Sequence, residues 1–374
     1  MLNRLLDPHR AAPSAARPFS RRALLGAALG AGGLGVPAAA ATGLPHAGHG
    51  RPLVPPVGGG PVGGGSPSLC LDGAGTPGLD VHAMLTDWDT GTVSRDREGR
   101  RVREFAIVAE ERVIEIAPGL QYQAWSYNGR VPGPSLRVTE GDRVRVHFTN
   151  RSCMPHTIHF HGIHAWRMDG TPGVGEPGPG ESVVYEFDAF PFGCHLYHCH
   201  TMPLAPHIYR GLYGAFVIDP DPERHPEHAA AARSRLLGSA ENAEWQELMM
   251  VMNAFDTNDD EENEVYAVNT VANAYHDRPI AVERARPIRV YLINVTEFDP
   301  INSFHTHANF FDYYDHGTTL TPTLRTVDTI IQCQGQRGLV EISYARHEPG
   351  PYMFHAHQAE FAEKGWMSLF DVRA

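Results

Sequence analysis

The chain has 374 residues, 42% hydrophobic and 20% charged, which is typical of a folded globular protein with two or three domains. Its formal charge of −12 argues against nucleic acid and anionic lipid as partners, because both bind basic surfaces. The 22 histidines are unusual, since many of them stand in pairs two residues apart.

The amino terminus predicts an export signal over residues 1–41. The run Ser20-Arg21-Arg22-Ala23-Leu24-Leu25 resembles a twin-arginine signal, and the apolar, Gly-rich stretch after it is too short to span a membrane. We therefore expect a periplasmic or extracellular protein, the alternative being an unprocessed tail. No later apolar run is long enough for a membrane span.

Residues 42–102 predict a flexible arm, because Gly and Pro are frequent there, as in the run from Gly58 to Gly65. From residue 103 to 220 the pattern indicates β-strands: Val144, Val146 and Phe148 alternate with polar residues. Residues 221–244, rich in Pro, Ala and charge, predict a linker with one helix over 229–237.

Strand signals resume over residues 245–374. Short strands with Gly and Pro between them predict an all-β protein with two β-sandwich domains, 103–220 and 245–374. Strands are expected near Glu181–Phe187, Gly211–Ile218, Leu248–Met252, Ile288–Val295, Leu339–Tyr344 and Trp366–Val372.

The two halves repeat one motif. Each has an asparagine (Asn128 or Asn269), then an HxH pair, and about forty to fifty residues later a second HxH pair that precedes an apolar strand. The pairs are His159/His161 and His198/His200 in the first half, and His305/His307 and His355/His357 in the second. Two copies of one metal-binding sandwich explain this register.

Strand geometry divides the first half's ligands between two sites. Side chains two residues apart share a face and those an odd number apart do not, so Cys199 points away from His198 and His200. By the same rule His156 points away from His159. A thiolate with imidazoles is the donor set of an electron-transfer copper, and His207, eight residues after the cysteine, supplies the second imidazole.

The axial position of that copper is expected to hold Leu212, five residues after His207, where a methionine is usual. A side chain that cannot coordinate should raise the reduction potential. Met202 is the competing axial candidate.

The eight paired imidazoles are too many for one metal and enough for three.

With these residues the chain resembles a two-domain multicopper oxidase, laccase-like and related to copper nitrite reductase, over residues 103–374. The resemblance implies two cupredoxin-like Greek-key β-sandwich domains. It also implies one type 1, one type 2 and two type 3 copper ions per subunit. The implied ligands are His156, Cys199 and His207 for type 1, His159 and His305 for type 2, and His161, His198, His200, His307, His355 and His357 for type 3.

The activity implied is one-electron oxidation of a reducing substrate at the type 1 copper, coupled to four-electron reduction of dioxygen to water at the trinuclear cluster. Cys199 would connect the two sites through the backbone to His198 and His200. In the second half Ala356 and Asn302 replace the thiolate and one histidine, so that domain should lack a type 1 site. Relatives of this kind imply a homotrimer with copper clusters between subunits.

Two carboxylates are candidates for moving protons. Asp169 stands where the resemblance places an acid near the type 2 site, and Glu360 follows His357 by three residues. The alternatives are that Asp169 starts a turn and that Glu360 is a surface charge.

The other cysteines are Cys70, Cys153, Cys194 and Cys333. Among them we favour a Cys153–Cys194 disulfide, with free thiols as the alternative.

Two other functions stay open. A copper nitrite reductase shares the type 1 set, but the resemblance implies that it has an acid at the position of His159 and no histidine at that of His200. A copper carrier without catalysis is a different class. The reductant is equally open: phenols, Cu(I), Fe(II) and small organic molecules all remain candidates.

Overall fold

The structure, a computed structural model, describes residues 78–374, which lie in one compact unit. The expected export signal, most of the expected arm, and Cys70 lie outside the described residues. No helix within 78–374 is long and apolar enough to cross a membrane.

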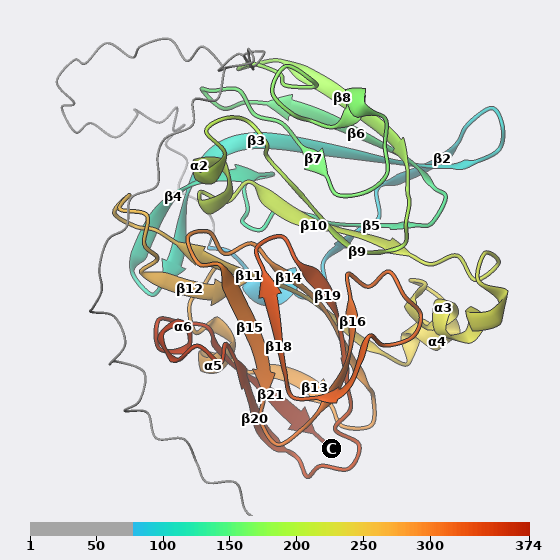
Figure 1. Cartoon of the computed structure of the whole chain (residues 1–374), viewed down its shortest axis with the longest axis vertical. Helices are drawn as coiled ribbons and strands as arrows, with labels where there is room; N and C mark the ends of the chain where they lie inside the picture. The colour runs from blue at the N-terminus through green and yellow to red at the C-terminus, as the bar shows by residue number, and fades with distance from the viewer. Residues whose placement is uncertain (1–77) are drawn as a thin grey trace, which may run out of the picture. The chain divides into compact units, whose positions relative to one another are not determined.

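The first half forms a β-sandwich (Figure 1). One sheet has the order β1 (Trp88–Asp89), β5 (Ser135–Thr139), β10 (Tyr213–Asp219), β9 (Gly193–His198) and β7 (His159–Phe160). The other has β2 (Thr92–Arg95), β3 (Arg101–Ala117), β6 (Arg143–Asn150) and β8 (Ser182–Asp188), with β4 (Leu120–Tyr127) paired to β3. The expected alternation holds in β6, where Val144, Val146 and Phe148 are buried between the sheets.

The second half forms another sandwich. One sheet has the order β12 (Val265–Val268), β11 (Gln246–Phe255), β14 (Ile288–Asn294), β19 (Arg337–Ile342), β16 (Phe311–Asp315) and β17 (Leu324–Val327). The other has β13 (Ile280–Glu283), β21 (Met367–Arg373), β20 (Gly350–His355), β15 (Ile301–Thr306) and β18 (Thr329–Cys333). The all-β prediction with two sandwiches is confirmed.

Short helices connect the strands. They are α1 (Val81–Met84), η1 (Trp166–Met168), α2 (Leu204–Tyr209), η2 (Pro226–His228), α3 (Ala229–Arg235), α4 (Ala240–Ala243), α5 (Ala274–Asp277) and α6 (Ala359–Glu363). Helix α3 confirms the helix expected in the linker. The linker packs closely, since the buried Arg235 donates to the carbonyls of Gly317 and Thr319 at 3.1 and 2.7 Å.

The flexible arm predicted over residues 42–102 was placed too far into the chain at its carboxyl end. Helix α1 and strands β1 and β2 already belong to the fold, because Val81, Met84 and Leu85 are buried in the core of the second sandwich and β1 pairs with β5. So few apolar residues next to a Gly- and Pro-rich stretch gave no clear strand or helix signal. The predicted end of the arm, residue 102, was therefore too late in the sequence.

A third apolar core and a buried charge network join the two sandwiches. Leu196 and Val217 of the first half pack in one cluster with Met249 and Ile293 of the second. Arg137, 1% exposed, pairs with Asp219 at 3.0 Å and with Glu247 of the other sandwich at 2.6 Å. The two halves therefore form one continuous interior.

Candidate metal centres

Three residues from separate elements meet below the surface of the first sandwich. His156 follows β6 in a loop, Cys199 comes directly after β9, and His207 lies in α2. Cys199 Sγ is 3.1 Å from His207 Nδ1 and 3.8 Å from His156 Nδ1, and the two Nδ1 atoms are 3.1 Å apart. All three side chains are buried, and their donor atoms are close enough for one metal ion. The structure thus brings together the three residues that the sequence analysis grouped.

Burial keeps these ligands neutral without a metal. It lowers the pKa of His156 to about 3, with His207 adding to the effect, and lowers that of His207 to about 4. It raises the pKa of the Cys199 thiol. A neutral imidazole offers a lone pair, and a metal ion would displace the thiol proton, so the site favours a thiophilic cation over hard ions such as Mg²⁺.

Groups around the sulfur were missed by the sequence reasoning. The backbone N–H of Thr157 donates to Cys199 Sγ at 3.3 Å, and the hydroxyl of Thr157 accepts the backbone N–H of His200 at 2.8 Å. The Trp125 ring lies 4.8 Å from that of His207, centroid to centroid. A threonine adjacent to a histidine carries no sequence signal of this role.

The two axial candidates lie in different surroundings. Leu212 is fully buried in the same core cluster as Cys199, and its N–H donates to the carbonyl of His207 at 3.2 Å. Met202 is 66% exposed. Leu212 therefore shares the buried surroundings of Cys199, whereas Met202 is largely exposed to solvent.

Four histidines form a first quartet at the edge of the first sandwich. His161 Nε2 and His198 Nε2 are 3.1 Å apart. The ring of His159 lies 5.2 Å from each of these rings and 5.5 Å from that of His200. Burial lowers the pKa of His161 to about 2 and that of His198 to about 4, so these imidazoles are also neutral.

The second sandwich carries a matching second quartet. His307 Nε2 and His355 Nε2 are 2.9 Å apart. The ring of His305 lies 5.1, 5.4 and 5.0 Å from those of His307, His355 and His357. The repeat expected from sequence therefore extends to the arrangement of the rings.

Backbone carbonyls fix how these rings face. The Nδ1 of His159 hydrogen bonds the carbonyl of Asp169 at 2.8 Å, and that of His305 the carbonyl of Asp328 at 2.9 Å. His198 Nδ1 does the same with the carbonyl of Cys199 at 2.8 Å. A carbonyl that accepts from one ring nitrogen leaves the other as the ligand, as is common in metal sites. His200 Nδ1 is buried without a hydrogen-bond partner, which also suits a site completed by a metal.

The two quartets are separate within one chain. Among residues 78–374 no hydrogen bond or ring contact joins the first to the second, and the potential metal-binding groups fall into different sets. His307 and His357 are exposed, whereas the type 1 candidates are not. Within the described residues the quartets are therefore two separate groups, and the second is the more open to solvent.

The structure separates the two carboxylate candidates. The Asp169 carboxylate lies 3.3 Å from His159 Nδ1, beside the first quartet. Glu360 lies in α6, where its exposed carboxylate pairs with Lys364 at 2.8 Å, and among the described residues it contacts none of the eight histidines. The expectation for Glu360 is not supported, because the helical turn after His357 carries it to the surface.

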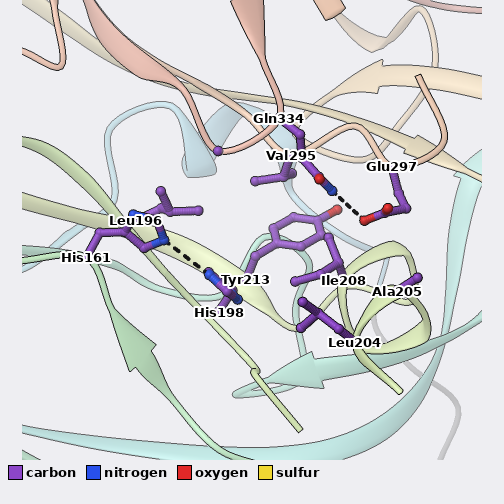
Figure 2. A pocket seen from close by; sticks show the side chains of 11 residues that line it. His161, Leu196, His198, Leu204, Ala205, Ile208, Tyr213, Val295, Glu297 and Gln334 are labelled. Atoms are coloured by element: carbon purple, nitrogen blue, oxygen red, sulfur yellow. Dashed lines mark hydrogen bonds between the residues drawn. The ribbon is translucent and has the colours of Figure 1, made fainter. Parts of the chain in front are cut away.

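A pocket of about 370 Å³ opens beside the first quartet. Figure 2 shows His161 and His198 at one side of it and a hydrogen bond between Gln334 and Glu297 at another, with Tyr213 between them. Burial raises the pKa of Glu297. The pocket provides room for small molecules next to two of the proposed ligands.

The preferred Cys153–Cys194 disulfide is wrong. Cys194 is a free, fully buried thiol in the core between the sandwiches, and burial raises its pKa to about 12. Cys153 is disulfide-bonded, but Cys194, Cys199 and Cys333 are all free. Proximity to ligand runs in sequence did not indicate proximity in space, because Cys194 faces the other sandwich.

The chain matches known proteins over both sandwiches. Residues 109–223 and 244–374 each match a family described as multicopper oxidase. A crystal structure of a multicopper oxidase is 49% identical, with a TM-score of 0.72, covering 79% of this chain and 98% of that one. A blue copper oxidase from Nitrosomonas europaea is 26% identical, with a TM-score of 0.59, covering 72% of this chain and 86% of that one.

A curated relative matches over a shorter stretch. A copper-containing nitrite reductase from Neisseria meningitidis is 35% identical over 112 residues, which is 29% of this chain and 28% of that protein. The matched part thus spans less than a third of this relative.

Proposed function

The chain belongs to the multicopper oxidase family, and on this premise we propose that it is a laccase-like oxidase. It would couple one-electron oxidation of a reducing substrate to four-electron reduction of dioxygen. The observation that carries the proposal is the position of Cys199. Its sulfur lies with His156 and His207, while its two backbone neighbours, His198 and His200, belong to the first quartet.

The donor atoms fit copper at both kinds of site. A buried thiolate with two imidazole Nδ1 atoms suits a type 1 copper, and quartets of neutral imidazoles suit type 2 and type 3 copper. Copper bound there would supply the one-electron redox steps. The proposed ligands are His156, Cys199 and His207 for type 1, His159 and His305 for type 2, and His161, His198, His200, His307, His355 and His357 for type 3.

The protein's residues would divide the remaining work. Four one-electron oxidations and four protons convert one dioxygen into two water molecules, so protons must reach the first quartet. Asp169 is suited to deliver them, because its carboxylate lies beside His159 while its carbonyl holds that ring in place. The pocket beside His161 and His198 would give dioxygen access.

We propose that a complete cluster forms between two copies of the chain in a homotrimer. The separation of the quartets supports this, as do large apolar side chains exposed near each of them. Ile163 and Trp166 follow His161 and are 68% and 76% exposed, and Ile331, 60% exposed, pairs in register with Ser303 in the strand of His305. A head-to-tail ring would bring one copy's first quartet to the next copy's second.

Mixing two inactive variants tests this arrangement. His161→Ala disables the first quartet and His307→Ala the second, so neither variant alone should consume dioxygen. After co-assembly, a first quartet from the His307→Ala chain can meet a second quartet from the His161→Ala chain, which restores part of the activity. No recovery in verified mixed trimers would contradict a shared cluster.

The competing functions predict different results in the same assays. Nitrite reduction without oxygen, or copper binding without oxygen uptake, would favour the nitrite reductase or the carrier. The matched stretch of the Neisseria protein does not decide between them. The presence of both full quartets favours the oxidase. Oxygen uptake with phenols, Cu(I) and Fe(II) would identify the reductant.

We also propose, from the twin-arginine pattern at Arg21 and Arg22, that the protein is exported.

A further inference from the structure

A buried chain of hydrogen bonds leads from His156 to a carboxylate on another strand. His156 Nε2 lies 2.8 Å from the hydroxyl oxygen of Ser152, and that hydroxyl donates to Glu111 Oε1 at 2.6 Å. Glu111 lies on β3, is 9% exposed, and also accepts the backbone N–H of Cys153 at 3.1 Å. The three side chains are all buried.

The direction of these hydrogen bonds follows from the groups involved. A carboxylate only accepts, and a hydroxyl has a single proton, so Ser152 gives its proton to Glu111. Its oxygen can then only accept, from His156 Nε2–H and, at 3.4 Å, from the N–H of Met154. A neutral imidazole has one N–H, so Nδ1 keeps its lone pair. That is the atom that faces Cys199 Sγ and His207 Nδ1.

The second sandwich lacks the type 1 ligands, so it shows which of these hydrogen-bonding groups are kept when those ligands are missing. The strand registers Ala109↔Asn150 and Met252↔Asn294 align β3 with β11. Asn128 and Asn269 support the same alignment, since each accepts an N–H from the aligned strand, at 2.7 and 2.9 Å.

In this alignment the hydroxyl is kept and the carboxylate is lost. Thr296 takes the place of Ser152, and its hydroxyl accepts from Asn302, the residue in place of His156, at 3.0 Å. Ala254 takes the place of Glu111 and is buried in the core. The carboxylate is therefore present only in the sandwich that has the thiolate and both imidazoles, and the shared scaffold does not require it.

We infer that Glu111 is a positioning residue for the type 1 site: through Ser152 it fixes His156 in the Nε2–H tautomer, with Nδ1 ready to bind copper. The inference rests on the proposed type 1 site but not on dioxygen as the oxidant. Partners of ligand imidazoles typically affect metal affinity about 10- to 100-fold, which sets the size of the expected effect.

The test compares four variants in the copper-free and copper-loaded protein. Ser152→Ala removes the acceptor but keeps the bond between Glu111 and Cys153, and Ser152→Thr restores a hydroxyl that the second sandwich already accommodates. Glu111→Ala installs the residue of the second sandwich. Glu110→Gln is the matched control, because Glu110 is the adjacent residue on β3 and pairs with Arg112 instead.

Nitrogen-15 NMR of the copper-free protein should show His156 as the Nε2–H tautomer in the parent, Ser152→Thr and Glu110→Gln. In Ser152→Ala and Glu111→Ala the Nδ1–H tautomer should appear, and type 1 copper should bind about 10- to 100-fold more weakly. An unchanged tautomer in Ser152→Ala would overturn the inference, as would an Nδ1–H tautomer in the parent. Absence of a blue type 1 band in the copper-loaded parent would instead refute the proposed function and leave the tautomer result standing.

Discussion

Cys199 and Ala356 occupy the same position in the two sandwiches, each fully buried and each directly after a histidine that ends a strand. The surrounding frame is the same in both. Ser303 accepts the backbone N–H of His357 at 2.8 Å, as Thr157 accepts that of His200. The second sandwich has thus kept the frame around this position without the sulfur, and within residues 78–374 only one group of potential metal ligands contains a cysteine.

Leu212→Met should lower the reduction potential of the type 1 copper. A thioether at the buried axial position would stabilise Cu(II), shifting the reduction equilibrium on the order of tenfold, or about 59 mV for one electron. Spectroelectrochemical titration of the blue band measures this shift. Met202→Leu is the matched control and should leave the potential unchanged, because Met202 is exposed. A shift in the control instead would assign the axial position to Met202.

Asp169→Asn should slow oxygen uptake without slowing reduction of the type 1 copper. The backbone carbonyl that holds His159 remains, so the ring keeps its orientation while proton delivery is lost. A loss of about 100-fold or more is expected for a group of this kind. Steady-state oxygen uptake and anaerobic stopped-flow reduction separate the two steps. Glu360→Gln should behave like the parent; if it were the slower variant, the assignment would be reversed.

The copper-free protein should lose stability as the pH falls from 6.5 towards 4. Burial lowers the pKa of His207 to about 4, so the unfolded chain binds a proton in this window and the folded chain does not. The free energy of unfolding falls by up to about 1.4 kcal/mol per pH unit for each such histidine. Urea denaturation at several pH values measures the free energy of unfolding as a function of pH. For His207→Gln this free energy should fall less steeply with falling pH than it does for the parent. The exposed His276→Gln should match the parent, and a pH-independent parent would contradict the neutral, buried imidazoles.

The grouping of the proposed ligands could be predicted from sequence because strand parity acts over a few residues. It separated Cys199 from His198 and His200, and the repeat revealed both quartets. The contacts of Glu111 could not be predicted. Glu111 and Ser152 are 41 residues apart in sequence, and only the pairing of β3 with β6 brings them together. The error at Cys194 has the same origin, because a position just before a ligand run in sequence does not show which core the side chain meets.

The central claim is that electrons reach the histidine cluster only through Cys199. Oxygen uptake by Cys199→Ser, loaded with copper and supplied with an oxidisable phenol, tests it most directly. We expect the blue absorption and oxygen uptake to disappear while copper at the histidine quartets remains, as measured by EPR and metal analysis. Oxygen uptake at the parent rate in this variant would contradict the account.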